Sequence, residues 1–579
     1  MRFIFAIICF VLAALSMGLG IAERTFLAGP DQVTASTTST TGAPVVVIDG
    51  AALDAYPRID SVQLTGSSTQ FAAYGRTSDV LAWVGDTNYT HVTFNAKTNK
   101  LVSRLHSGSA TSVPNPAGSD LWLGEYQGSQ SRNFHPKIPS SDSIIAVSNG
   151  TDPAPSKVSL VWPLDNQVAW SGPIIGIGAI LLVIGLLLLL WAFTHLRRMR
   201  GPRRTQQRMP KLPRQPRYKP SRKAVTATKG RRAINRLVAV VPGVAITGLL
   251  LAGCTATPTP AVPTPSQKPT TATLTRAVSP VVSPVQLQLI MQHVSSTVAA
   301  ADDTSNATTL GTRMEGPALA ERTAAYTIAA KDKKAVPPTP IPATTVGNYT
   351  LPEASDKWPR TVLTVVQNKA DTKSAPIAVM LQQDDPRSNY KVEYAIALQP
   401  NIVLPDVAPA KIGAVGMDPN GKLLSVEPSA IALDYGDILL HDTSSASYPL
   451  FQAEGDTFRT QVGMQAKIKQ QKALPSTAKL TFANAQGAGR TIALATLNAG
   501  AIVAVDLNEI ETVRPVKAGA FVSAPGGIRA LSGKASSSKG LVATYDDQLL
   551  FFVPGAGKSG KIVLLGFSQG LIAAQEYKK

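Results

Sequence analysis

Three long apolar runs divide the chain, and they cover residues 3–22, 173–193 and 237–253. The first two contain no charged side chain. As helices, which rise 1.5 Å per residue, they are long enough to cross about 30 Å of hydrocarbon. The third run is shorter and ends beside Cys254. This pattern predicts a membrane protein with two or three transmembrane helices.

The apolar runs and the composition between them divide the chain into eight segments. They are an N-terminal transmembrane anchor or signal peptide (1–22), an extracytoplasmic β-rich domain (23–169), a transmembrane helix (170–195), a basic disordered cytoplasmic loop (196–236), a third apolar segment or lipoprotein-like signal (237–253), a Thr/Pro-rich tether (254–278), and two α+β units (279–425 and 426–579).

Charge beside the second apolar run sets the expected orientation. The chain has a net charge of +19, and residues 197–236 hold sixteen Lys and Arg and no acid. Because basic loops stay in the cytoplasm, this segment is expected inside and residues 23–170 outside, at the plasma membrane. The loop is also expected to attract anionic lipid headgroups. The rest of the chain is nearly neutral, so no nucleic-acid partner is expected.

Two interpretations of the first apolar run stay open. An uncleaved anchor is favoured because the run is longer than the apolar part of most signal peptides. The small-x-small pattern of Gly20, Ile21 and Ala22 supports a cleavable signal peptide instead.

The third apolar run resembles a bacterial lipoprotein signal. Basic residues precede it, it ends in Leu251-Ala252-Gly253-Cys254, and a Thr/Pro-rich stretch follows. The resemblance implies that the Cys254 thiol carries a diacylglyceryl group and that the chain is cut before it. The alternative is a third transmembrane helix. In both cases residues 255–579 are expected outside.

The first outer domain carries short β-rich runs separated by Gly, Ser, Asn and Pro, which favours a small all-β sandwich or barrel without a helix. Its expected strands cover 45–48, 79–84, 90–95, 100–105, 143–148 and 157–162. His91, His106 and His135 lack the spacing of metal ligands, so no metal site is expected.

After the tether, helical and strand patterns occur twice in the same order, which predicts a tandem α+β region. Helices are expected at 280–300, 316–331, 428–442 and 455–474. Strands are expected at 361–367, 376–383 and 390–399, and again at 478–484, 490–497, 501–516, 541–553 and 561–567. This order resembles nuclear-transport-factor-like cone folds, in which a curved sheet wraps a long helix. Such folds serve enzymes and binding modules alike.

Over most of its length the chain is similar to a group of uncharacterised membrane proteins of actinobacteria. The similarity rests on the stretches SDLWLGEY (119–126), APSKVSLVWPLDN (154–166), WPRTVL (358–363) and DDPRSNYKVEYAIAL (384–398). It implies a cell-envelope architecture and carries over no reaction.

One motif suggests a hydrolase. Residues 566–570 match GxSxG, after an expected strand and before an expected helix, which is the setting of a nucleophilic serine. No His or Asp follows, however, so Ser568 would need His441 or His293 in a different arrangement.

Two further patterns have simpler interpretations. Residues 555–559 resemble the end of a phosphate-binding loop, but Phe552 stands where the first Gly is required and a strand follows, so a hairpin turn is expected. The paired acids at 302–303, 384–385 and 546–547 are expected in turns or loops, since neighbours in sequence do not face each other across a cleft.

We therefore expect a membrane-anchored envelope protein whose outward-facing domains bind other envelope proteins or cell-wall components, with Cys254 as its lipidation site and without catalytic residues, metal or cofactor. An envelope hydrolase using Ser568 and a cone domain that holds a small ligand are the alternatives.

Overall fold

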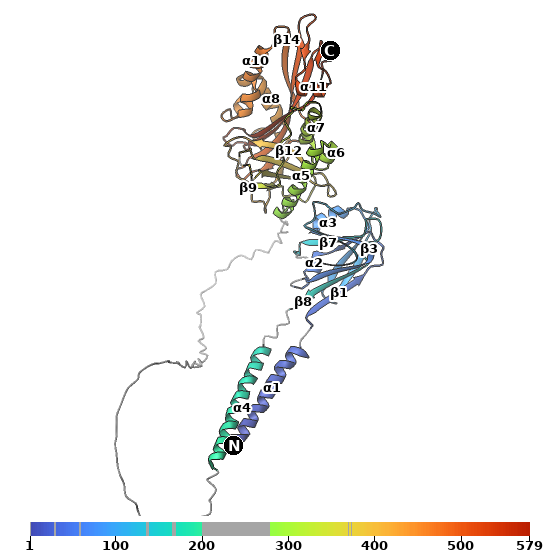
Figure 1. Cartoon of the computed structure of the whole chain (residues 1–579), viewed down its shortest axis with the longest axis vertical. Helices are drawn as coiled ribbons and strands as arrows, with labels where there is room; N and C mark the ends of the chain where they lie inside the picture. The colour runs from blue at the N-terminus through green and yellow to red at the C-terminus, as the bar shows by residue number, and fades with distance from the viewer. Residues whose placement is uncertain are drawn as a thin grey trace, which may run out of the picture. The chain divides into compact units, whose positions relative to one another are not determined.

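The computed structural model of the chain describes residues 2–27, 30–56, 59–134, 138–164, 170–199, 278–368, 370–371 and 373–578 (Figure 1). They belong to two compact units. One unit combines residues 1–28 with 168–275, and the other combines 29–167 with 276–579. The basic loop from residue 200 on, the third apolar run, Cys254, His135 and most of the tether lie outside the described residues.

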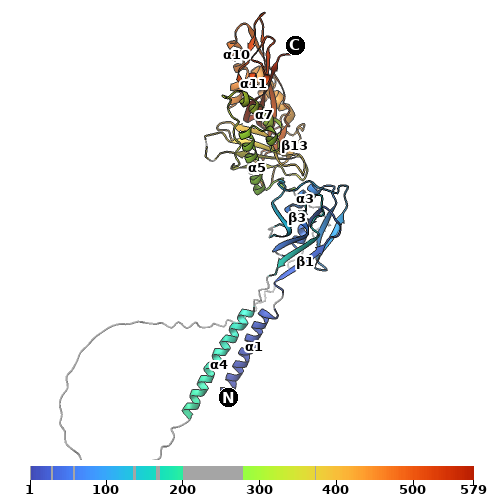
Figure 2. The ribbon, with the colours of Figure 1, turned by 45° about the vertical axis from the view of Figure 1, so that its right-hand side comes forward.

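The first unit is built on a pair of antiparallel helices, α1 (Arg2–Thr25) and α4 (Ser171–Met199), which lie side by side in Figures 1 and 2. Both are long and apolar enough to cross a membrane, over Phe3–Thr25 and Ser171–Arg198. Most of their large apolar side chains are exposed, as expected for a surface that contacts lipid. The first two predicted spans are therefore present as helices.

Glycines bring the two helices together. A Cβ atom on Gly178 would lie 2.5 Å from Cγ of Met17 and 2.7 Å from Oγ of Ser16. A Cβ on Gly20 would lie 2.6 Å from a side-chain carbon of Ile175. Small residues at such contacts let helix backbones approach closely, which drives helix association in lipid.

The part of the second unit before residue 168 is one eight-stranded sheet of order β1-β8-β3-β7-β2-β4-β5, in which β6 pairs with β3. Its strands are β1 (Gln32–Thr38), β2 (Val45–Ile48), β3 (Ser61–Arg76), β4 (Tyr89–Asn95), β5 (Lys100–His106), β6 (Gly124–Phe134), β7 (Asp142–Val147) and β8 (Lys157–Pro163). All neighbouring strands are antiparallel except β2 and β4. Thr37 on β1 hydrogen-bonds Ser103 on β5, so the sheet curls until its two ends touch.

The expectation of an all-β domain without a helix is wrong. Residues 79–84, predicted as a strand, lie in helix α3 (Thr77–Val84), and α2 (Gly50–Leu53) is a second short helix. The reason is the spacing of Val80, Trp83 and Val84, which places all three on one helix face. That face packs into one of the two cores of this sheet.

The C-terminal part contains the predicted helices and strands in order, but the helix expected at 455–474 is divided in two, and further elements occur at 307–310, 345–352, 416–417 and 526–532. The first set contains α5 (Pro284–Thr304), α6 (Ala307–Leu310), α7 (Gly316–Lys331), β9 (Thr345–Pro352), β10 (Arg360–Val366), β11 (Ile377–Gln383) and β12 (Lys391–Leu398). The second contains β13 (Gly416–Met417), α8 (Ile431–His441), α9 (Thr457–Val462), α10 (Met464–Ala473), β14 (Ala478–Gln486), β15 (Ile492–Ala495), β16 (Ala501–Pro515), α11 (Gly526–Ser532), β19 (Leu541–Val553) and β20 (Val563–Glu576), with the small β17–β18 pair (Val522–Ser523, Ser536–Ser537).

The two α+β units share one ten-stranded sheet of order β13-β15-β16-β19-β20-β12-β11-β10-β9, with β14 on β16. Three cores lie along it. α5 and α7 cover one half through Val362 and Val379, and α8 covers the other half through Val503 and Phe551. The opposite faces of both halves pack against each other in a third core, whose members include Leu363, Met380, Ile396, Ile502, Ala504 and Leu550. Figure 1 shows α8 and α10 on the side of the strands away from α6 and α7.

An engineered disulfide tests whether α1 and α4 pack against each other in the membrane. A Cβ on Gly185 would lie 3.3 Å from Cβ of Cys9, close to the separation of about 3.5–4.5 Å in disulfides. In a Cys254→Ser background we therefore expect Gly185→Cys to form a bond with Cys9 when membranes are oxidised, detected as a cross-linked peptide by mass spectrometry. Gly176→Cys is the matched control, because no atom lies within 4 Å of its Cβ position. Absence of the bond, with loss of the N-terminal peptide, would indicate a cleaved signal peptide.

Candidate functional site

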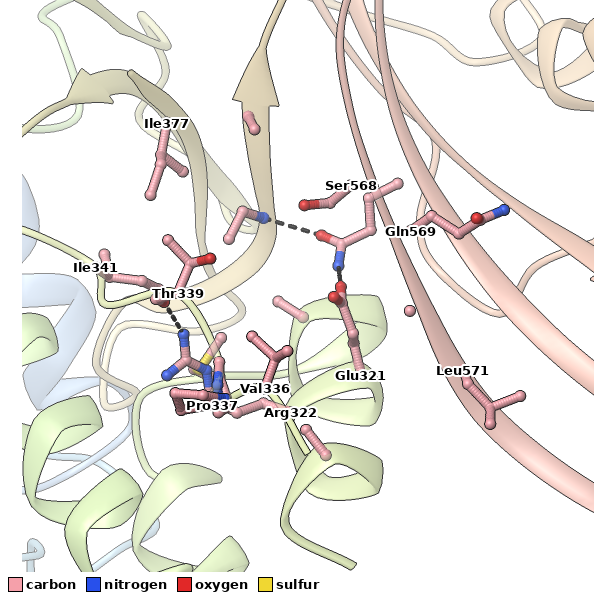
Figure 3. A pocket seen from close by; sticks show the side chains of 18 of the residues that line it. Glu321, Arg322, Val336, Pro337, Thr339, Ile341, Ile377, Ser568, Gln569 and Leu571 are labelled. Carbon is pink, nitrogen blue, oxygen red and sulfur yellow. Dashed lines mark hydrogen bonds between the residues drawn. The ribbon is translucent and has the colours of Figure 1, made fainter. Parts of the chain in front are cut away.

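The candidate site is a cavity of about 540 Å³ in the C-terminal part, between α7, the segment that follows it, and strands β12 and β20 (Figure 3). Its walls are mostly apolar. They come from Met314, Ala318, Ala325, Ile328, Val336, Pro337, Pro338, Ile341, Ile377, Ala395, Ala397 and Leu571. Polar side chains enter at only a few places, and an apolar cavity with few polar groups is the usual form of a small-molecule site.

Glu321 and Gln548 are the central polar pair of the cavity. Gln548 Nε2 donates to Glu321 Oε2 at 2.6 Å, and Gln548 Oε1 accepts a hydrogen bond from the Ala395 backbone at 2.9 Å. Figure 3 shows this chain of bonds crossing from α7 to the sheet. Burial raises the pKa of the Glu321 carboxyl, while the bond from Gln548 and the charge of Arg322 act in the opposite direction.

Arg322 also lines the cavity, but its guanidinium is already engaged. It forms an ion pair with Asp302 on α5 and donates to the Thr339 carbonyl. Tyr326 donates to the second oxygen of Asp302 at 2.6 Å. The positive charge on this wall is thus paired within the protein, and Glu321 is the acidic side chain of the cavity wall.

Ser568 lies on the cavity wall, but not in the setting that GxSxG predicts. The residues after it continue β20 to Glu576, so the helix expected there is wrong. His441 hydrogen-bonds Asp437 on α8, and His293 lies 3.8 Å from Asp120. Neither histidine lines the cavity with Ser568.

Close packing accounts for both glycines of the motif. A Cβ on Gly566 would lie 2.5 Å from the Ala397 carbonyl oxygen, at the pairing of β20 with β12. A Cβ on Gly570 would overlap the Glu321 side chain. Gly566 and Gly570 therefore allow β12 and Glu321 to approach this strand, and the GxSxG pattern needs no reaction to account for it.

A pair of buried acids lies on the sheet next to the cavity. Asp506 on β16 and Asp546 on β19 are both buried, and they lie close enough for the charge of Asp506 to raise the pKa of Asp546. Gly489 N–H donates to Asp506 at 2.7 Å. Burial, with the nearby charges of Asp506 and Glu321, raises the pKa of Asp546 to about 9. Burial also raises the pKa of Asp506.

The paired acids of the sequence have three different outcomes. Asp384 and Asp385 lie in the predicted loop, between β11 and β12. Asp302 and Asp303 instead close the last turn of α5. The prediction for 546–547 is also wrong, since both residues lie in the middle of β19 and are buried. Burial raises the pKa of Asp547 well above its ordinary value.

Glu321 and Asp506 were not singled out in the sequence, although a signal exists for each. Glu321 stands at a helical spacing from Ala318, Ala325 and Ile328, so it is an acid on an apolar helix face. Asp506 interrupts the apolar run of β16. Acids at such positions are rarely buried without a partner, which makes them candidates for a site.

Residues 555–559 form the predicted turn between β19 and β20, with Gly557 at φ 72°. Over the described part of the chain, no group of three or more His, Cys, Asp and Glu side chains could hold a metal ion. The lipidation site Cys254 lies outside that part.

A family model described as a domain of unknown function (DUF8094) matches residues 278–576. The chain belongs to this family. The match runs from just before α5 to the last residue of β20. The DUF8094 region therefore includes both α+β units, the cavity and the acid pair. Comparison of the chain with curated proteins and with solved structures finds no match.

Replacing Asp546 by Asn is expected to stabilise the protein at alkaline pH. The folded protein holds a proton on Asp546 up to about pH 9. An unfolded chain releases it near pH 4, so the free energy of unfolding falls as pH rises between these values. Asn keeps a neutral group at this position and removes that loss. We expect a gain of about 1 kcal/mol or more at pH 8, which disappears toward pH 4.

The measurement is thermal unfolding of the detergent-solubilised chain across this pH range. Asp303→Asn is the control because Asp303 is exposed, and it should leave the pH profile unchanged. If the unfolding temperatures of wild type and Asp546→Asn change with pH in parallel, the buried, protonated state of Asp546 is contradicted.

Proposed function

We propose that this protein is a membrane-anchored cell-envelope binding protein whose DUF8094 region holds a small, mostly apolar molecule. The observation that carries the proposal is the cavity of about 540 Å³ beneath α7, whose apolar walls surround the Glu321–Gln548 pair. Cavities of about 300–1,000 Å³ are of the size that small ligands and cofactors occupy.

We place both folded parts of the second unit outside the cell, at the plasma membrane. The basic segment after α4 favours a cytoplasmic location for residues 197–236, and α1 and α4 then enclose an outer domain. Buried contacts join this domain to the C-terminal part, including the ion pair of Asp79 with Arg360. Such a contact requires both parts to be on the same side of the membrane, which supports a further crossing by residues 237–253.

Lipid attachment at Cys254 is the form of anchoring that we favour for the C-terminal part. The Leu-Ala-Gly-Cys sequence and the Thr/Pro-rich stretch after it support this proposal. An actinobacterial source would agree with it, since the sequence resembles envelope proteins of that group.

Processing at Cys254 is tested by an immunoblot of the C-terminal region in the native host. We expect a fragment of about half the full mass, and we expect inhibition of the lipoprotein signal peptidase or Cys254→Ser to replace it with the intact chain. Full-length chain under all three conditions would instead indicate a third transmembrane helix.

The cavity has the placement expected for a nuclear-transport-factor-like cone, which supports that resemblance. It lies between a long helix, α7, and the strands that this helix covers. Glu321 is the acidic side chain of the cavity wall, and a carboxyl oxygen there can accept a hydrogen bond from a ligand. We therefore propose a ligand with an apolar body and one amine or hydroxyl group.

Three water-soluble probes of similar size test this assignment: phenethylamine, phenylethanol and phenylpropionate. Their binding is measured by ligand-observed NMR with the full chain in lipid nanodiscs. We expect the amine and the alcohol to bind. The carboxylate should not bind, because it would face the Glu321 carboxyl on the cavity wall. Glu321→Gln should weaken the amine by about tenfold and the alcohol much less, since only the amine gains from a negative partner.

A cavity-filling variant locates the binding. Ala325 lines the cavity from α7, so Ala325→Trp is expected to abolish binding. Ala330→Trp is the matched control, because Ala330 is an exposed residue of the same helix and does not line the cavity. Equal binding by both variants would show that the probes occupy another place, and the proposed function would then be wrong.

A further inference from the structure

Two buried aspartates of the first β-rich domain are paired with arginines of the DUF8094 region. The Asp79 side chain is 1% exposed, and its partner Arg360 is fully buried. The Asp120 side chain is 1% exposed, and its partner Arg313 is 9% exposed. The members of each pair lie far apart along the chain. Within the second unit, these contacts therefore form an interface between the β-rich domain and the DUF8094 region.

Asp79 is the centre of the first contact. Arg360 Nη2 donates to Asp79 Oδ1 at 2.8 Å, and Arg76 Nε donates to Asp79 Oδ2 at 2.8 Å. The same Arg76 guanidinium reaches across the interface and donates to the carbonyls of Pro280 and Val281. One carboxylate therefore orients two guanidinium groups, one from each side.

Asp120 is the centre of the second contact. Its Oδ2 accepts hydrogen bonds from Arg313 Nη1 and, at 2.8 Å, from the Tyr390 backbone. The carbonyl of Asp120 accepts from Gln286 Nε2 at 3.1 Å, and its N–H donates to Asn389 Oδ1 at 3.0 Å. Side chain and backbone of one residue are thus bound by four different residues of the other part.

Arg387 forms a third contact at the end of α3. Its guanidinium donates to the Trp83 carbonyl at 2.9 Å and to the Val84 carbonyl at 3.0 Å. These carbonyls are among the last of α3, where a cation also interacts favourably with the helix dipole. Nearby, Trp358 of the DUF8094 region packs against the apolar core that contains Trp83.

These contacts have the character of a specific protein–protein interface. A buried charge is strongly unfavourable unless it is paired, and Asp120, Arg313 and Arg360 find their ion-pair partners in the other part. Aromatic and arginine side chains at the centre of the contact are the residue types that dominate binding between proteins.

We infer that the β-rich domain and the DUF8094 region recognise each other without needing a covalent connection. Each is the binding partner of the other, and a cut between residues 253 and 254 would leave a complex of a two-span protein with a lipoprotein. The inference itself does not depend on such a cut occurring in the cell, nor on a ligand in the cavity.

The test introduces its own cut. A site-specific protease sequence is inserted between Pro265 and Ser266 of the full chain, and membranes carrying the protein are treated with the protease and sedimented. The released piece, residues 266–579, has lost any lipid on Cys254 and any third span. We expect it to stay with the membranes through the β-rich domain. Its appearance in the supernatant would overturn the inference.

Variants show whether this interface is what retains the fragment. Arg387→Gln removes the contacts to α3 and is expected to raise the dissociation rate of the fragment by about tenfold. Arg529→Gln is the matched control, an exposed arginine of α11 in the same region, and should have no effect. Neither residue is part of a core, so folding should be preserved.

A second substitution acts from the opposite side. Arg76→Gln on the β-rich domain removes the bonds to Pro280 and Val281, and combined with Arg387→Gln it should release the fragment faster than either change alone. Equal retention of wild type, both single variants and the double variant would mean that another surface holds the fragment, and would also overturn the inference.

Discussion

The pairing of β12 with β20 is the contact on which the arrangement of the DUF8094 region depends. Only Ala397 with Phe567 and Leu398 with Gly566 are paired, yet this short ladder joins two α+β units into one sheet. Gly566 allows it, because any larger residue would meet the Ala397 carbonyl. The cavity follows from the same pairing, since α7 belongs to the first α+β unit and β20 to the second α+β unit.

Polar contacts beside this ladder hold the two units in register. Arg490 of the second α+β unit binds two acids of the first α+β unit, Asp384 at 2.6 Å and Glu315 at 2.9 Å. Gln399 connects the end of β12 to the Leu564 carbonyl at 2.6 Å and to the Thr457 backbone at 2.8 Å. The two α+β units are therefore parts of one domain, which agrees with the single family match over residues 278–576.

Local patterns could be predicted from the sequence wherever one strong periodicity was present. Helix α7 has the predicted bounds, Gly316–Lys331, and β2 has the predicted bounds, Val45–Ile48. Errors arose where tertiary contacts decide between two local choices. Residues 571–576 contain good helix formers, but β20 continues through them because β19 offers partners as far as Leu541, opposite Glu576.

The site was harder to predict than its elements. The cavity needs α7, β12 and β20 together, and these are separated by more than two hundred residues between Glu321 and Ser568. No local pattern indicates that Gln548 will meet Glu321. The sequence did contain Ser568 as a candidate, and that residue does line the cavity, but its motif came from the packing of two glycines.

Buried charge has two different uses in this molecule, and the difference bears on function. Asp506 and Asp546 are buried near each other, and burial raises the pKa of both carboxyls, so stability falls toward alkaline pH. Asp79 and Asp120 are buried with arginines from another part of the chain. Apolar residues of similar size would often hold an interface as well or better, so buried ion pairs are evidence for specificity rather than for stability.

Three of the four stretches that suggested an envelope architecture meet at this interface. Residues 119–126 supply Asp120, residues 358–363 supply Arg360, and residues 384–398 supply Arg387 together with the backbone of Tyr390. These residues define which two parts dock and in what orientation, and none of them lines the cavity. These three stretches therefore supply the contact between the two parts, and the third also supplies Ala395 and Ala397 to the cavity wall. Under the proposed function, the choice of ligand depends instead on the residues around Glu321.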